Sequence, residues 1–139
     1  MKTVIDSNVI TALMNPDDAL NRAVLAALNL CGPGQLVVPA PVFAELLAAP
    51  KRTEEFLDTF FHETGITVEW ILDEMVWRAA GHAFRAYAAR RRKRGIEGPG
   101  QILTDFLIGA FALRYGFQLL TLDRRLYRAA FPGLKIVLA

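Results

Sequence analysis

Four acidic residues, Asp6, Glu45, Asp105 and Asp123, are placed along the chain so that their carboxylates could act together. Asp6 directly follows a β-branched run, and Asp123 follows an apolar one. Glu45 borders the apolar face of an expected helix, and Asp105 heads another helix that is otherwise apolar. Crowded carboxylates repel one another, and a hard divalent cation such as Mg²⁺ or Mn²⁺ removes that cost. Such a cation can activate a water and stabilise charge on a phosphoryl group during displacement.

Short β-like runs alternate with longer helical runs along the 139 residues. Strands are expected at Thr3–Ile5, Leu36–Val38, Ile66–Val68, Phe117–Thr121 and Ile136–Leu138. Helices are expected at 9–14, 19–28 (with Asp17 or Asp18 as the N-cap), 41–49, 53–64, 73–94, 104–115 and 123–130. This alternation predicts a single three-layer α/β domain over residues 1–139, with a central, mainly parallel sheet of about five short strands flanked by helices.

The expected sheet gives the four acids a common place. In open α/β sheets the ligand site lies outside the carboxyl ends of the strands, which is where Asp6 and Asp123 are expected. These two residues converge if the first and fourth strands are neighbours, and Glu45 and Asp105 could then reach the same cleft. Each acid also has a purely structural alternative: Asp6 and Asp123 as N-caps, Asp105 as a partner of a helix dipole, and Glu45 at the border of the core.

Composition excludes several classes of protein. The hydrophobic content of 53% argues against disorder, and no apolar run approaches the roughly 20 residues that a membrane span needs. Asp6 interrupts the stretch that a secretory signal would use. The single cysteine, Cys31, excludes an internal disulfide and a cysteine-based zinc site, and His62 and His82 have no ligand spacing. We therefore expect a soluble cytoplasmic protein with no membrane association.

Positive charge is concentrated in one run. Removing the five consecutive cations at 90–94 from the net charge of +2 leaves a body with a charge of −3. A cationic patch on a mildly acidic body is compatible with a polyanionic ligand, and also with a helix C-terminus whose cations complement its dipole. The segment GIEGPG at 95–100 follows directly and could be a substrate loop or an ordinary connector.

Three sequence segments together carry a resemblance. They are VIDSNVI at 4–10, FAELL at 43–47 and TDFLIGAFALRYGFQLLTLDRRLYRAAF at 104–131. In this order they resemble the PIN-domain nucleases, and within them the VapC-like toxins of type II toxin–antitoxin pairs. The first segment is similar to the family's opening strand and first acid, and the second to the segment with its glutamate. The third is similar to its third acid, helix, strand and final T-x-D.

The resemblance implies a Mg²⁺- or Mn²⁺-dependent endoribonuclease, the toxin of a toxin–antitoxin pair. Its metal ligands would be Asp6, Glu45, Asp105 and Asp123. Thr121 would orient Asp123 or a metal-bound water, and Asn8 would hydrogen-bond within the acidic cluster and hold Asp6 in place. The implied partners are an RNA substrate, a cognate antitoxin and a second copy of the chain in a homodimer. The cationic run is denser than the family's pattern. The candidate RNA-binding residues are those of the run and one arginine before it: Arg85, Arg90, Arg91, Arg92, Lys93 and Arg94.

Two other functions remain open at this point. Asp6-Ser7-Asn8-Val9 is similar to the D-x-D-x-T/V opening of aspartate-dependent phosphatases and phosphotransfer domains, although Asn8 replaces the second acid. In that scheme Glu45 and Asp105 have no role. A non-catalytic RNA-binding PIN-like module would keep the fold without cleaving, and loss of an acid would favour it, yet all four acids are present.

Overall fold

All five expected strands form, and they pair into one sheet. The computed structural model describes residues 1–96 and 103–138. Its strands are β1 (Thr3–Ile5), β2 (Leu36–Pro39), β3 (Thr67–Glu69), β4 (Gln118–Thr121) and β5 (Ile136–Leu138). Their order across the sheet is β3-β2-β1-β4-β5, and each adjacent pair is parallel. The predicted parallel α/β sheet is confirmed.

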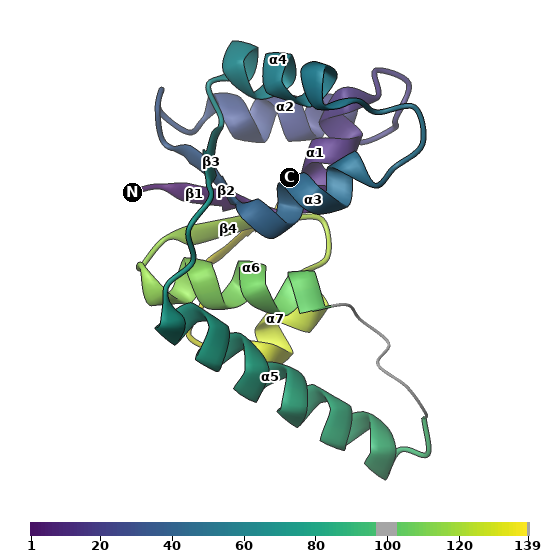
Figure 1. Ribbon diagram of the computed structural model, residues 1–139, viewed down its shortest axis with the longest axis vertical. Coiled ribbons are helices and arrows are strands. Elements are labelled where there is room, and N and C mark those ends of the chain that lie inside the picture. Colours follow the sequence, from purple (N-terminus) through teal and green to yellow (C-terminus); the bar gives the residue numbers. More distant parts are fainter. Residues whose placement is uncertain (97–102, 139) are drawn as a thin grey trace.

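Seven helices are described, and they cover both faces of this sheet. They are α1 (Ser7–Met14), α2 (Asn21–Asn29), α3 (Ala40–Leu47), α4 (Glu54–Thr64), α5 (Glu74–Lys93), α6 (Leu103–Arg114) and α7 (Arg124–Ala130). Because parallel connections are right-handed, the order of the strands puts α1 to α4 on one face and α5 to α7 on the other. Figure 1 shows these two layers above and below the sheet. α3 also reaches across to contact α6.

The most buried helix is α6, whose residues from Phe106 to Ala112 are all buried. It packs against β1, β2 and β4 on one side and along α5 on another, so it must be apolar nearly all round. The strands are apolar for the same reason, and Val4 and Ile5 are fully buried in β1. Within the described residues no helix combines the length and the apolar character needed to cross a bilayer.

Local capping explains where several helices begin and end. Thr53 Oγ1 accepts a hydrogen bond from the Phe56 amide at 3.1 Å, which starts α4, and Asp73 caps α5 in the same way. Gly95 has a φ of 71°, so it ends α5 as expected. The rest of the segment expected as a loop at 95–100 lies largely outside the described residues. The expected cap of α2 is wrong, because Asp18 Oδ1 instead accepts from the Leu20 amide at 2.8 Å in a turn before the helix.

A substitution at Gly109 tests how tightly α6 packs. A Cβ at this position would lie 2.3 Å from Cε2 of Phe131, a ring that is itself buried. Alanine normally stabilises a helix by about 1 kcal/mol relative to glycine, but the overlap here should outweigh that gain. We expect Gly109→Ala to lower the free energy of unfolding by about 1–3 kcal/mol in urea denaturation.

Gly81→Ala in α5 is the matched control, because a Cβ there meets nothing within 4 Å. It should raise the free energy of unfolding by about 0.5–1 kcal/mol. Equal gains in the free energy of unfolding for both variants would show that the Phe131 ring can move aside without lowering stability.

Candidate active site

The pairing of β1 with β4 brings two of the acids to one edge of the sheet. Ile5 is aligned with Leu120, and the Asp6 amide donates to the Leu120 carbonyl at 3.0 Å. Asp6 therefore leaves β1 beside the end of β4, and Asp123 follows two residues after β4 ends. The convergence expected for neighbouring first and fourth strands is confirmed in the backbone.

Asp6 is the most deeply buried of the four acids, with 3% of its surface exposed. Its Oδ2 accepts a hydrogen bond from the Thr121 hydroxyl at 2.8 Å, and its Oδ1 accepts one from Ser7 at 3.4 Å. Burial raises the pKa of Asp6, and the Thr121 hydrogen bond only partly offsets that effect. Asp6 and Asp123 occupy the N-cap positions of α1 and α7, yet neither side chain makes a capping hydrogen bond. Helix capping therefore does not account for these two acids.

Thr121 and Asn8 organise the backbone around Asp6. The fully buried Thr121 hydroxyl donates to Asp6 and accepts from the Asp123 amide at 3.0 Å, so it connects the two acids. Asn8 Oδ1 accepts from the Leu122 amide at 3.3 Å. Among the described residues Asn8 makes no hydrogen bond to Asp6, so it fixes the connection after β4 rather than holding the Asp6 side chain as the resemblance implied.

Glu45 and Asp105 reach the same place from two helices that pack together, α3 and α6. Burial, followed by the charges of Asp6, Glu45 and Asp123, raises the pKa of Asp105 to about 7. The four acids are thus close enough to act on one another. Glu45 is half-buried, and its Oε2 is fully buried without a hydrogen-bond partner in the described structure. Asp105 lies in the first turn of α6, but its raised pKa shows that the helix dipole does not offset the burial and the neighbouring charges.

Tyr127 is a member of this group that sequence reasoning missed. It lies one turn after Asp123 in α7, and 1% of its surface is exposed. Burial, followed by the charges of Asp6 and Asp105, raises the pKa of Tyr127. The only sequence signal was its position four residues after Asp123, which places it one turn along the same helix.

The acidic centre, defined here as Asp6, Glu45, Asp105 and Asp123, holds an excess of negative charge. The ion pairs found in the described structure join Arg78 to Glu74 and Arg114 to Asp73, and none involves the centre. Carboxylate oxygens are the donors that Mg²⁺ and Mn²⁺ prefer, and the unpartnered Glu45 Oε2 suits such an ion. As the side chains are placed, no three His, Cys, Asp or Glu residues in the described ranges are close enough to share one ion. Binding a metal would require these carboxylates to close in.

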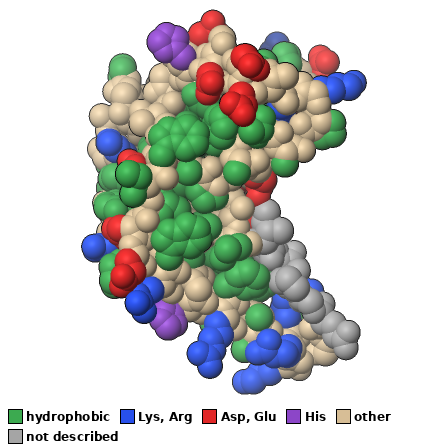
Figure 2. Space-filling model, viewed as in Figure 1, with side chains coloured by type: hydrophobic (Ala, Val, Ile, Leu, Met, Phe, Trp, Pro, Cys, Tyr) green, Lys and Arg blue, Asp and Glu red, His purple; other side chains and the backbone are tan. Residues whose placement is uncertain are grey.

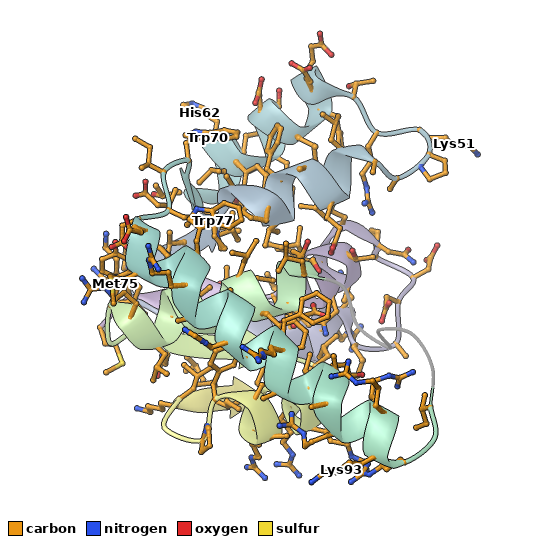
Figure 3. All side chains as sticks on the ribbon, turned by 60° about the horizontal axis from the view of Figure 1, so that its bottom comes forward. Lys51, His62, Trp70, Met75, Trp77 and Lys93 are labelled. Carbon is orange, nitrogen blue, oxygen red and sulfur yellow. The ribbon has the colours of Figure 1, made fainter. Side chains whose placement is uncertain are left out.

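The candidate RNA-binding cations lie in the C-terminal half of α5 and, for Arg94, directly after it. This half of α5 extends beyond the sheet, and Lys93 is at its far end (Figures 1 and 3). The guanidinium groups of Arg90 and Arg91 lie 6.0 and 5.7 Å from the ring centre of Tyr87. α7 packs against α5 and adds Arg124, Arg125 and Arg128, and it contains no acid.

A model of the family described as the PIN domain matches residues 3–132. The chain belongs to the PIN domain family. This confirms at the family level the resemblance carried by the acidic segments. No curated protein matches this PIN domain in sequence.

Solved structures share the fold of this PIN domain over nearly its whole length. FitAcB from Neisseria gonorrhoeae matches with a TM-score of 0.64 at 20% identity, covering 96% of this chain and 95% of that chain. A toxin-antitoxin complex from Klebsiella pneumoniae matches with a TM-score of 0.63 at 18% identity, covering 98% of this chain and 96% of that chain. VapBC-1 from nontypeable Haemophilus influenzae matches with a TM-score of 0.69 at 19% identity, covering 99% of this chain and 97% of that chain. Identities this low establish the fold that the chains share.

The raised pKa of Asp105 predicts a pH-dependent stability in metal-free protein. An unfolded aspartate releases its proton near pH 4, whereas folded Asp105 keeps it until about pH 7. The folded state is therefore relatively most stable below pH 4, and it loses stability as the pH rises to 7. Asp105→Asn removes this loss. We expect the variant to be about 1 kcal/mol more stable than wild type at pH 8, which corresponds to a rise of about 3 °C in Tm. The effect is this small because solvent screens the half-buried Asp105.

At pH 4 the Tm of Asp105→Asn should equal that of wild type. Thermal denaturation in the presence of a chelator measures the Tm of the variant and of wild type at each pH. Asp58→Asn, on the exposed side of α4, is the matched control and should not shift Tm in a pH-dependent way. A gain in Tm for Asp105→Asn that is the same at both pH values would show that ionisation of Asp105 is not its cause.

Proposed function

We propose that this PIN domain is a metal-dependent endoribonuclease. The observation that carries the proposal is the acidic centre at the ends of β1 and β4, with a buried, unpartnered Glu45 Oε2 and a raised pKa at Asp105. The family consists generally of nucleases, and this centre has the oxygen donors and the uncompensated charge that a divalent cation needs. Phosphodiester hydrolysis is the reaction that such a centre serves best.

Asp6, Glu45, Asp105 and Asp123 would hold Mg²⁺ or Mn²⁺. A bound ion would lower the pKa of an attacking water and offset charge on the phosphate. Thr121 keeps the Asp6 carboxylate oriented by donating to its Oδ2. Asn8 and Thr121 together hold the backbone at Leu122 and Asp123, so Asp123 is presented from a fixed connection. The unengaged Glu45 Oε2 would either complete the ligands of the ion or accept a proton from the attacking water.

We further propose that the protein is the toxin of a toxin–antitoxin pair and acts in the cytoplasm as a homodimer. The similar structures from Klebsiella and Haemophilus, described as a toxin-antitoxin complex and VapBC-1, support an antitoxin partner that would cover the acidic centre.

An apolar face supports contact with a second copy. Trp70, Ile71, Met75 and Trp77 are each at least half exposed, and the two tryptophans line one groove with Ala40 and other residues of α3. Figure 2 shows hydrophobic side chains gathered at the middle of this side of the molecule, and Figure 3 labels Trp70, Met75 and Trp77 there. A twofold contact places the same patch of each chain against the other, which buries an exposed apolar surface efficiently.

RNA would bind along the α5–α7 surface, which we define as the C-terminal half of α5 together with Arg124, Arg125 and Arg128 of α7. The sequence has no acid between Glu74 and Ile96, so the charged side chains in the C-terminal half of α5 are all cationic. The aromatic rings of Phe84 and Tyr87 pack on Phe106 rather than standing free for base stacking. The surface therefore suits the phosphate backbone more than the bases.

The phosphatase alternative is not favoured by the geometry. Asn8, at the position of the expected general acid, has its side-chain oxygen engaged by the Leu122 amide. In that scheme Glu45 and Asp105 would raise the charge of the centre without any function. The non-catalytic RNA-binding alternative predicts binding without cleavage, and activity measurements separate it from the nuclease.

The α5–α7 surface predicts a salt-dependent loss of RNA affinity. Arg85 and Arg92 are exposed on α5, and Arg94 is exposed at its C-cap. Replacing all three with Gln, in an Asp105→Asn background that prevents cleavage, should weaken RNA binding about tenfold or more at low salt. The slope of log K against log salt should also fall by roughly 2, because fewer counterions are released.

A triple variant with Arg22, Lys51 and Lys135 changed to Gln removes the same charge from exposed positions elsewhere. It should bind RNA nearly as well as the parent protein. Equal losses in the two triple variants would show that net charge, and not this surface, governs binding.

The central experiment compares RNA cleavage by wild type and Asp105→Asn with Mn²⁺ or Mg²⁺, and with a chelator. We expect cleavage by wild type that requires the metal, and a loss of at least about 100-fold in the variant, since one ligand and one charge of the centre are removed. Asp58→Asn removes one carboxylate charge outside the centre and should cleave like wild type. Cleavage that persists equally in Asp105→Asn would contradict the proposed site.

A further inference from the structure

The Tyr127 hydroxyl is a buried donor with no acceptor assigned to it. The residue is 1% exposed, and its oxygen is shielded from solvent without a partner at full hydrogen-bond distance and angle in the described structure. Its hydroxyl is nevertheless near enough to Asp6 and Asp105 to favour the ionised form of each. A buried hydroxyl without a partner costs roughly 1–3 kcal/mol. Phenylalanine would fill the same space without that cost, so packing alone does not explain the hydroxyl.

The surroundings of the hydroxyl are unusually rich in acceptors. Tyr127 interacts electrostatically with Asp6, Asp105 and Asp123, all members of the acidic centre. Carboxylates only accept hydrogen bonds, and a tyrosine hydroxyl can donate one. Tyr127 is therefore a neutral donor placed among anionic acceptors.

Hydrogen bonding already present distinguishes the candidate acceptors. Asp6 accepts from the hydroxyls of both Thr121 and Ser7. Asp105 is half-buried and surrounded by negative charge, and among the described residues the nearby Tyr127 hydroxyl is the donor that interacts with it. Asp105 is thus the carboxylate without another orienting donor, and Tyr127 is the nearby hydroxyl that is free to orient it.

Resting on the proposed function, we infer that Tyr127 is a positioning residue of the metal centre. When a divalent cation is bound, this hydroxyl would donate to one carboxylate oxygen of Asp105 and leave the other oxygen available to the ion. Residues that orient metal ligands in this way typically change metal affinity 10- to 100-fold when they are removed. Tyr127 would do for Asp105 what Thr121 does for Asp6.

Binding of Mn²⁺ alone, followed by the electron paramagnetic resonance signal of the free ion, tests this inference in the full chain without RNA. We expect Tyr127→Phe to bind Mn²⁺ about tenfold more weakly than wild type. The metal-free variant should have the same circular dichroism spectrum and a Tm equal to or above that of wild type, because an unpaired buried hydroxyl has been removed.

Tyr115→Phe is the matched control. Its hydroxyl donates to Asp73 at 2.6 Å, outside the acidic centre, so its removal should leave Mn²⁺ affinity unchanged. Equal Mn²⁺ affinities in wild type and Tyr127→Phe would overturn the inference and leave the metal site standing. A lower Tm of metal-free Tyr127→Phe would also overturn it, since the hydroxyl would then have a structural partner. A wild-type protein that binds no Mn²⁺ would overturn the proposed function itself.

Discussion

The parallel pairing of β1 with β4 is the constraint on which the acidic centre depends. One backbone hydrogen bond, from the Asp6 amide to the Leu120 carbonyl, extends this pairing past the end of β1. It puts Asp6 next to Thr121, whose hydroxyl then bridges the Asp6 carboxylate and the Asp123 amide. A slip of one residue would turn the Asp6 side chain to the other face of the sheet and break that bridge. The register of two short strands therefore determines whether the site exists.

This arrangement buries negative charge, which lowers the stability of the folded chain. Desolvation is the largest influence on both Asp6 and Asp105, and for Asp105 the three other carboxylates add to it. The helix dipole and the few hydrogen bonds do not compensate, as the pKa of about 7 at Asp105 shows. No arginine or lysine forms an ion pair with the four acids in the described structure. Such a centre lowers the stability of the folded chain and gains most from a ligand that carries concentrated positive charge.

Much of the fold was predictable because its signals are local. The β-branched Thr3-Val4-Ile5 and the breaker at Gly95 fix element ends through their own backbone preferences. Every described element lies within two residues of its expected bounds. Asp6 and Asp123 were found because the rule for strand ends needs only the order of elements. The partner of Asn8 and the role of Tyr127 could not be found this way. The partner of Asn8 depends on a contact across more than a hundred residues, and the place of Tyr127 beside the acidic centre depends on how α7 packs.

The two helical layers also differ in charge, and this polarity bears on how a polyanion would approach. α4 carries Glu54, Glu55, Asp58 and Glu63, all exposed, whereas α5 and α7 carry most of the cations (Figures 1 and 2). The acidic centre lies between these layers, at the edge of the sheet. A phosphate backbone would be attracted by the α5–α7 surface and repelled by α4, so it would not lie symmetrically across the centre. In the proposed function the cations would hold the phosphates on one side, and the carboxylates would repel the nearest phosphate until a cation offsets their charge. Substrate binding and metal binding would then be coupled by electrostatics, and each would strengthen the other.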